Sequence, residues 1–213
     1  MIGAVGKDEF GHRIRAALDA DGIDTTGLLV ADEPTGTAHI VVDATGENSI
    51  VVVPGANGSV RTLADDHREV IRTSDVLLLQ LELPIEVVNE AATWAAEHAT
   101  RVVLTLAPVA PLPGDLLAAV DLLVPNEHEA GLLTGGLDAR DAALRRRRRG
   151  VDAVAVTTGR RGCVYADSEG VVQVAALDVE AIDTSAAGDT FVAALSVALA
   201  EGRPVAPTDL ALG

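Results

Sequence analysis

Short apolar runs that are continuous rather than alternating constrain the fold of this chain most. A strand covered on both faces gives such an unbroken run, which is typical of parallel sheets. Four runs have the length of a strand: Val76–Leu81, Val102–Leu106, Leu122–Pro125 and Ala153–Thr157. Helix-like stretches lie between or after them: Ile85–His98, Gly114–Ala119, Glu127–Leu133 and Asp138–Arg149. The order predicts an α/β fold, with a three-layer, mostly parallel sheet flanked by helices.

One segment, at about residues 35–55, departs from this pattern. Thr37–Asp43 and Ser49–Val53 flank the turn-rich spacer ATGEN, and together they predict a small antiparallel hairpin. Such a hairpin could be a lid or an oligomer contact, and an edge hairpin that finishes the sheet explains it equally well. With 213 residues and 48% hydrophobic side chains, the chain is long enough for one principal domain over residues 1–213.

Charge and composition exclude several classes of partner. The net charge of −16 disfavours a nucleic-acid or anionic-membrane surface, and aromatic residues at 2% leave little for base stacking. No apolar run reaches the roughly 20 residues that a bilayer requires. The first residues, MIGAVGKDEF, lack the regions of a signal peptide, and the one cysteine permits no internal disulfide. We therefore expect a cytoplasmic protein without nucleic-acid or membrane partners.

Five arginines at Arg145–Arg149 form the one low-complexity feature. Positive side chains suit the negative end of a helix dipole, so a solvated helix terminus is favoured over an anion-binding patch.

The stretch DTSAAGDTF, residues 183–191, is the first candidate site. Ligands of open α/β sheets bind beyond the carboxyl ends of the strands. A loop with Gly188 that enters a helix at Asp189 exposes backbone N–H groups, which suit a phosphate or a developing oxyanion. Asp189 could then take a proton from a hydroxyl that attacks the phosphate. Ordinary capping of the helix explains the same residues equally well.

The stretch TTGRRG, Thr157–Gly162, directly follows a buried run. Its hydroxyls and glycines can approach a nucleotide closely, and Arg160 or Arg161 can face the phosphates. A hairpin turn into a next strand, Cys163–Ala166, is the alternative, and the pattern is neither a P-loop nor a dinucleotide fingerprint.

Two further candidate sites directly follow apolar runs. In PNEHEA, the oxygens of Asn126, Glu127 and Glu129 could reach Mg²⁺ through water, while plain capping of a helix is the alternative. Glu82, in LLLQLELP, could accept hydrogen bonds from sugar hydroxyls, although an isolated acid at a strand end is usually only solvated.

The order of these motifs resembles the ribokinase-like, or PfkB, family of carbohydrate kinases over essentially the whole chain. The family signature Asp-Thr-x-x-Ala-Gly-Asp-x-Phe stands here at residues 183–191. Further stretches also look like the ribose-specific members: VGKDEFG, GENSIVVVPGAN, LLLQLELP, LAPVAPLP and VPNEHEAGLLTG. The resemblance implies a phosphotransferase that moves the γ-phosphoryl group of ATP to a primary hydroxyl of a sugar, first of all ribose to ribose 5-phosphate. A kinase for another sugar or a nucleoside, and a non-catalytic nucleotide-binding remnant, are the alternatives.

The resemblance also implies roles for individual residues. Asp189 would be the catalytic base and would contact the sugar. The backbone of Ala186, Ala187, Gly188 and Asp189 would form the anion hole for the transferring phosphoryl group. Glu82 would hold sugar hydroxyls, and Asn126 with Glu129 would organise Mg²⁺ and phosphate.

The same resemblance implies the nucleotide and monovalent-cation sites. Residues of the ATP site would be Asn126, Thr157, Thr158, Gly159, Arg160, Arg161, Gly162 and Gly188. Asp183 and Ser185 match two ligands of a monovalent cation, which we expect to be K⁺. The hairpin at residues 37–53 matches a lid over the sugar that also supplies a homodimer contact.

The chain also departs from the family pattern. The Asn-x-Asp strand and the Gly-Gly segment that bind the sugar in the family precede the point where this chain begins, and the family continues through further helices after the point where it stops. We therefore expect a chain truncated at both ends, and little or no turnover because contacts to the acceptor are lost.

Overall fold

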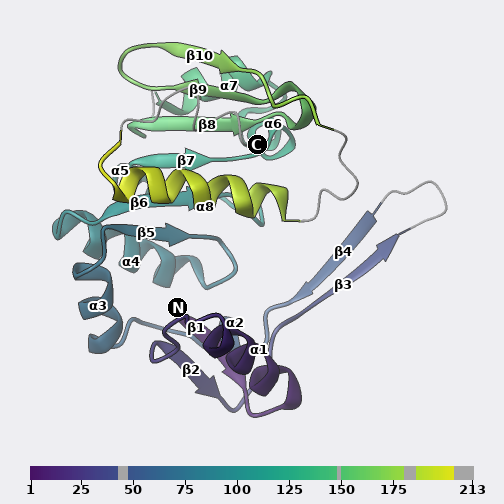
Figure 1. Ribbon diagram of the computed structural model, residues 1–213, viewed down its shortest axis with the longest axis vertical. Helices are drawn as coiled ribbons and strands as arrows, with labels where there is room; N and C mark the ends of the chain where they lie inside the picture. Colours follow the sequence, from purple (N-terminus) through teal and green to yellow (C-terminus); the bar gives the residue numbers. More distant parts are fainter. Residues whose placement is uncertain (43–47, 148–149, 180–185, 204–213) are drawn as a thin grey trace. The chain divides into compact units, whose positions relative to one another are not determined.

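The computed structural model describes residues 1–42, 48–147, 150–179 and 186–203 (Figure 1). The chain divides into two compact units. The first contains Met1–Glu69 with Glu82–Val88, and the second contains Val70–Leu81 with Asn89–Gly213. A single domain over residues 1–213 stays a prediction.

A six-stranded sheet forms the centre of the second unit, in the order β10-β9-β8-β7-β6-β5. Its strands are β5 (Val76–Leu79), β6 (Arg101–Thr105), β7 (Leu122–Val124), β8 (Ala153–Thr157), β9 (Cys163–Ala166) and β10 (Val171–Val174). Strands β5 to β8 run parallel, and β9 and β10 join antiparallel to them. The predicted α/β fold is confirmed, and its central sheet is mixed.

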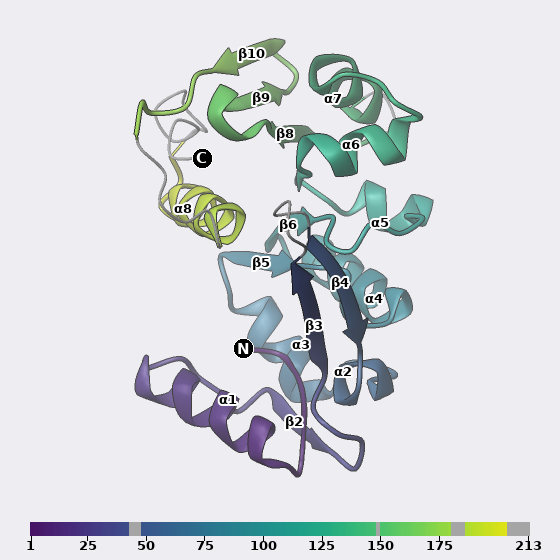
Figure 2. The ribbon, with the colours of Figure 1, turned by 90° about the vertical axis from the view of Figure 1, so that its right-hand side faces the viewer.

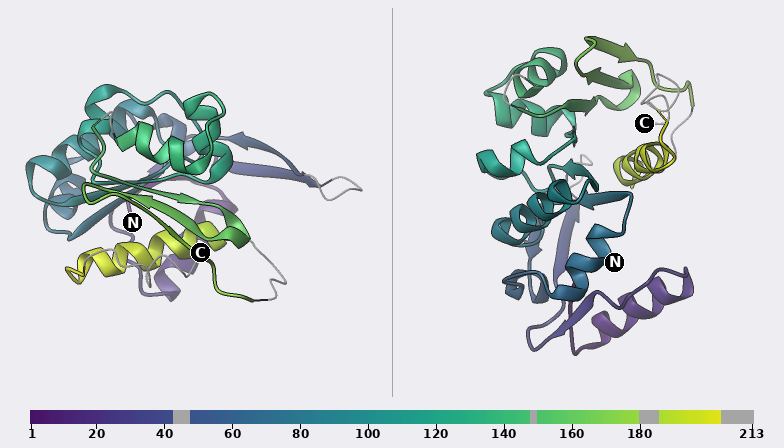
Figure 3. Two further views of the ribbon diagram at one scale, coloured as in Figure 1. Left: turned by 90° about the horizontal axis from the view of Figure 1, so that it is seen from above. Right: turned by 90° about the vertical axis from the view of Figure 1, so that its left-hand side faces the viewer.

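Helices cover both faces of this sheet. Their bounds are α4 (Ile85–Glu97), α5 (Gly114–Ala118), α6 (Glu127–Thr134), α7 (Ala139–Arg147) and α8 (Ala187–Ala200). Helix α3 (Asp65–Arg72) lies mostly in the first unit. Helix α8 lies on one face, and α5, α6 and α7 lie on the other (Figures 2 and 3). Within the described ranges, no helix is both long and apolar enough to cross a bilayer.

The apolar runs are buried because both faces are covered. Val102, Val103 and Leu104 of β6 are 0% exposed, as are the three central residues of β8. On the α8 face, Phe191 and Leu195 pack in one core cluster with residues of β6 to β10. The predicted strand Val76–Leu81 is shorter in the structure and ends at Leu79, although Leu81 is buried and its N–H donates to the carbonyl of Ala107.

The first unit contains a small parallel pair of strands and the predicted hairpin. Strand β1 (Gly3–Gly6) pairs with β2 (Leu28–Ala31), beside α1 (Glu9–Ala20) and α2 (Ala56–Ser59). Strands β3 (Thr37–Val42) and β4 (Asn48–Val53) pair antiparallel (Figure 1). Because they form a two-stranded sheet of their own, the hairpin does not finish the larger sheet.

The arginine run has a different role from the predicted one. Arg145 donates from Nη1 to the carbonyl of Thr134 at 2.8 Å, and Arg146 donates from Nη2 to the carbonyl of Leu133 at 3.0 Å. These carbonyls belong to the last turn of α6, where a positive charge is favourable. Arg146 is only 7% exposed, so it stabilises the end of a neighbouring helix and is not a solvated side chain. Residues 148–149 lie outside the described part of the chain.

Asp8 caps α1 and also binds a residue far along the chain. Its Oδ1 accepts hydrogen bonds from the backbone N–H of Gly11 at 2.9 Å and from the hydroxyl of Thr35 at 2.6 Å. Its Oδ2 accepts from the N–H of Thr35 at 2.8 Å. The hydroxyl of Thr35 first, and the two backbone donors after it, lower the pKa of Asp8 from 3.8 to about 2.

The lowered pKa predicts how stability depends on pH. Because the folded pKa lies below the unfolded one, the contribution of Asp8 is complete above about pH 4 and is lost as the pH falls to about 2. In an Asp8→Asn variant, the urea midpoint should fall less steeply over this range than in the wild type. Asp115→Asn, at the start of α5, controls for the loss of one exposed carboxylate. If the urea midpoints of the wild type and of Asp8→Asn fall equally between about pH 4 and pH 2, protonation of Asp8 does not cause the loss of stability.

Candidate active site

Two predicted motifs meet at the carboxyl ends of β7 and β8. Asn126 forms an isolated parallel bridge with Thr157, and the N–H of Thr157 donates to the carbonyl of Pro125 at 3.0 Å. The sequence separates these motifs by some thirty residues, and the parallel pairing of the two strands brings them together. One edge of the sheet therefore carries both the PNEHEA and the TTGRRG residues.

Asn126 and Glu129 form a reciprocal capping box at the start of α6. The side-chain Oδ1 of Asn126 accepts from the N–H of Glu129 at 2.8 Å, and Oε2 of Glu129 accepts from the N–H of Asn126 at 2.8 Å. The capping alternative is therefore correct for both residues. Their part in holding Mg²⁺ stays a prediction, and it would use the carboxylate oxygen of Glu129 that the capping box does not engage.

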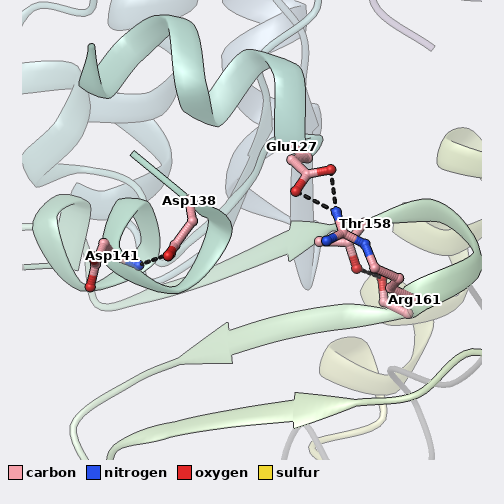
Figure 4. Close-up of polar contacts among 6 residues, drawn as sticks. Glu127, Asp138, Asp141, Thr158 and Arg161 are labelled. Atoms are coloured by element: carbon pink, nitrogen blue, oxygen red, sulfur yellow. Dashed lines mark hydrogen bonds and ion pairs between the residues drawn. The ribbon is translucent and has the colours of Figure 1, made fainter. Parts of the chain in front are cut away.

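The TTGRRG residues form a tight turn between β8 and β9. Gly159–Arg161 make one turn of 3-10 helix, and Thr158 donates from both its N–H and its hydroxyl to the carbonyl of Gly162, at 2.8 and 2.9 Å. The hairpin-turn alternative is thus also correct. Arg161 pairs through Nη2 with both carboxylate oxygens of Glu127, which ties the turn to the start of α6 (Figure 4).

The start of α8 differs from those of α1 and α6. Asp8 and Asn126 cap α1 and α6 with their side chains, whereas Ala186 at the corresponding position of α8 has no side-chain oxygen to offer. The first N–H groups of a helix have no partner within the helix, and a helix start without a side-chain cap is a common type of anion-binding site. Ala187, Gly188 and Asp189 are all exposed.

Ala186 also has an unusual backbone. Its φ of 56° lies in the left-handed region, which costs a residue with a Cβ about 1–2 kcal/mol. Such strain often accompanies functional sites. Nothing in the residue types of DTSAAGDTF predicts which alanine adopts this conformation. Asp183 and Ser185, the predicted ligands of a monovalent cation, lie outside the described residues.

The start of α8 lies at the same end of the sheet as the carboxyl ends of β7 and β8 (Figure 1). Phe191 and Leu195 hold the helix in this direction, since both are buried against the sheet. Asp189 therefore lies, with the Asn126 and Thr157 motifs, along one edge of the second unit. Glu82 follows β5, is exposed, and belongs to the first compact unit.

No group of three or more His, Cys, Asp or Glu side chains that could hold a metal occurs among the described residues. Asn126, Glu127 and Glu129 at the start of α6 carry oxygen atoms of the type that a hard cation such as Mg²⁺ accepts, often through water.

Comparison with known proteins decides the family. The model for "pfkB family carbohydrate kinase" matches residues 1–207. The chain belongs to this family. It is therefore a phosphotransferase with an alcohol group as acceptor, as the sequence predicts. The kinase is 38% identical to the ribokinase of Schizosaccharomyces pombe, over 96% of this chain and 68% of that protein. It is also 38% identical to the ribokinase of Bacillus subtilis, over 96% of this chain and 69% of that one.

Solved structures agree with this assignment. A ribokinase of Thermotoga maritima superposes on the kinase with a TM-score of 0.87 and 32% identity. The match covers 99% of this chain and 70% of the Thermotoga protein. A ribokinase of Arabidopsis thaliana, solved with ribose and ATP, has a TM-score of 0.88 and 32% identity, and the match covers 95% of this chain and 69% of that one.

Two glycines of the TTGRRG turn provide a test of its geometry. Both have positive φ, but a Cβ at Gly162 would lie 1.9 Å from the carbonyl oxygen of Val174, whereas a Cβ at Gly159 would meet nothing within 4 Å. We expect Gly159→Ala to lower the free energy of unfolding by about 1 kcal/mol, through backbone strain alone. Gly162→Ala should lower it by about 3 kcal/mol or more, because the backbone must move. Urea denaturation measures both, and equal losses would contradict the geometry.

Proposed function

We propose that this carbohydrate kinase is a ribokinase, which transfers the γ-phosphoryl group of ATP to the primary hydroxyl of ribose and forms ribose 5-phosphate. The uncapped start of α8, with Asp189 in its first turn, carries the proposal. The 38% identity to curated ribokinases and the similarity to a ribokinase solved with ribose and ATP support ribose as the acceptor over another sugar or a nucleoside.

The chemistry follows from what the start of α8 offers. Phosphoryl transfer requires positioning and charge stabilisation more than covalent catalysis. The N–H groups of Ala187, Gly188 and Asp189 stabilise the transferring phosphoryl group as an anion hole. The carboxylate of Asp189 accepts the proton of the attacking hydroxyl. Glu82 accepts hydrogen bonds from sugar hydroxyls.

The remaining candidate residues serve the nucleotide and the cations. Thr157, Thr158 and the turn up to Gly162 line the ATP site, where Arg160 is exposed and available to the phosphates. Asn126 and Glu129 organise Mg²⁺, which neutralises the charge of the ATP phosphates when it is bound. Asp183 and Ser185 are proposed as ligands of K⁺ on the strength of the signature in which they stand.

We also propose that the kinase acts in the cytoplasm, where ATP is available. Cys163, the single cysteine, is buried, and burial raises the pKa of its thiol to about 12. A thiol of this kind behaves as a small apolar core residue and is protected from oxidation.

Asp189→Asn tests the catalytic assignment. Removal of the base should lower kcat with ribose by about 100-fold or more. The KM values for ATP and ribose should change little, because asparagine has nearly the same shape. Formation of ADP in the presence of ribose measures the rate. Glu201→Gln, at the far end of the same helix, serves as the matched control. If Asp189→Asn turns over as fast as the wild type, Asp189 is not the catalytic base. If the wild type phosphorylates fructose or a nucleoside faster than ribose, ribose is not the preferred acceptor.

Both faces of the β3–β4 hairpin carry apolar side chains that are exposed in the described part of the chain. On one face Ile40 pairs with Ile50, and on the other His39 pairs with Val51. Ile40, Ile50 and Val51 are 54–61% exposed. A two-stranded hairpin is marginal by itself, and exposed apolar surface of this kind marks an interface. We propose that one face covers the sugar and that the Ile40–Ile50 face contacts a second copy of the chain.

A charge on the Ile40–Ile50 face tests the homodimer. The wild type should sediment as a dimer, and Ile50→Glu should sediment as a monomer because a buried carboxylate would be unpaired. Val172→Glu replaces an exposed side chain of β10 and should leave the dimer intact. A monomeric wild type, or a dimeric Ile50→Glu variant, would refute this interface.

A further inference from the structure

The two ends of the β3–β4 hairpin meet at one place in the first unit. The chain enters the hairpin through Asp32–Gly36 and leaves it through Pro54 and Gly55 into α2. The N–H of Ala56 donates to the carbonyl of Pro34 at 2.8 Å, so the entering and leaving segments are bonded directly to each other. We call these two segments the hairpin root.

Thr35 ties the entering segment to β1 and α1. Its hydroxyl accepts from the N–H of Gly6 at 2.9 Å and donates to Oδ1 of Asp8 at 2.6 Å, while its own N–H donates to Oδ2 of Asp8 at 2.8 Å. Thr35 is 6% exposed. The bond from Gly6 to the hydroxyl of Thr35 is buried, and the two bonds to Asp8 are partly buried. Hydrogen bonds to a charged group are stronger than neutral ones, and a buried bond is costly to lose, so together they hold the segment in place.

Helix α2, which directly follows the leaving segment, is tied to the same strand. Oδ1 of Asn57 accepts from the N–H of Ala4 at 2.8 Å. The N–H groups of Ala4 and Gly6 are two residues apart on one strand, so they point toward the same edge. That edge of β1 therefore donates to Thr35 in the entering segment and to Asn57 in α2, directly after the leaving segment.

The root is also closely packed. A Cβ at Gly6 would lie 2.6 Å from the carbonyl oxygen of Glu33, and one at Gly55 would lie 2.4 Å from the carbonyl oxygen of Pro34. These contacts are with backbone atoms, which cannot rotate away. Close packing and the hydrogen bonds together make the root a rigid mount and leave the strands of the hairpin exposed beyond it.

We propose that Asp8 and Thr35 are positioning residues, which fix the direction of the β3–β4 hairpin and thereby the affinity of the kinase for its sugar. The second half of this statement rests on the proposed function, in which the hairpin covers the sugar. Since the strands of the hairpin bury little of their own surface, the orientation of the hairpin depends on its root. Loosening the root lowers the fraction of molecules in which the hairpin is correctly placed, which weakens sugar binding in proportion.

Hydrogen exchange of the free protein tests the mount without any substrate. Thr35→Val keeps the shape of the side chain but removes the hydroxyl that bonds Gly6 and Asp8. It should raise the exchange rates of the β3 and β4 amides by about tenfold, because local opening becomes easier. Thr35→Ser retains the hydroxyl and should stay within about twofold of the wild type. Wild-type exchange rates in Thr35→Val would overturn the proposal.

Thr25→Val is the matched control for a general loss of stability. Thr25 is 9% exposed and lies in the same unit, and its hydroxyl also bonds a carboxylate, that of Asp19, at 2.7 Å. This variant should leave the exchange of the hairpin amides as in the wild type. If Thr25→Val accelerates their exchange as much as Thr35→Val does, the hydroxyl of Thr35 has no special part in holding the hairpin.

Kinetics with ribose test the consequence for the sugar. Thr35→Val should raise the KM for ribose by about tenfold and leave the KM for ATP and kcat within about twofold. An unchanged KM for ribose together with a lower kcat would contradict a positioning role. If the wild type does not phosphorylate ribose at all, the proposed function fails, whereas the exchange experiment still decides whether the root holds the hairpin.

Discussion

The burial of one face of α8 against the central sheet is the interaction on which the rest of the site depends. Phe191 and Leu195 are 1% and 0% exposed, and they pack with residues of β6 to β10. Burying side chains of this size contributes about 2–3 kcal/mol each. Because the helix is held along the sheet in this direction, Asp189, two residues before Phe191, is presented at the edge where β7 and β8 end.

The two helices that begin at this edge are used in different ways. Helix α6 satisfies its own first N–H groups with the reciprocal bonds of Asn126 and Glu129. Helix α8 begins at an alanine in a left-handed conformation, and no side chain of the described residues caps it. A capped helix start would compete with an incoming phosphate, so the absence of a side-chain oxygen at Ala186 suits a site that must bind and release a phosphoryl group.

The strands formed by continuous apolar runs were the part of the fold that the sequence predicted well. The four runs became β5 to β8, and the helices between them began within one residue of the predicted positions. Strand β1 was missed because GAVG is short and half glycine, and β10 was missed because VVQV follows a turn with little pattern of its own. The arginines of α7 were read as solvated since their partners, the last carbonyls of α6, are set only by how the two helices pack.

The sequence by itself determined the class of fold, the family and the identity of the chemical groups, because continuous apolar runs and the spacing of DTSAAGDTF are local properties. Only the tertiary structure decided which groups meet. The bridge between Asn126 and Thr157 joins the segment that follows β7 to the end of β8, and the bonds of Thr35 to Asp8 and Gly6 span 27 and 29 positions. Contacts of this kind depend on the pairing of strands and on packing in three dimensions, and neither leaves a pattern in the neighbouring residues.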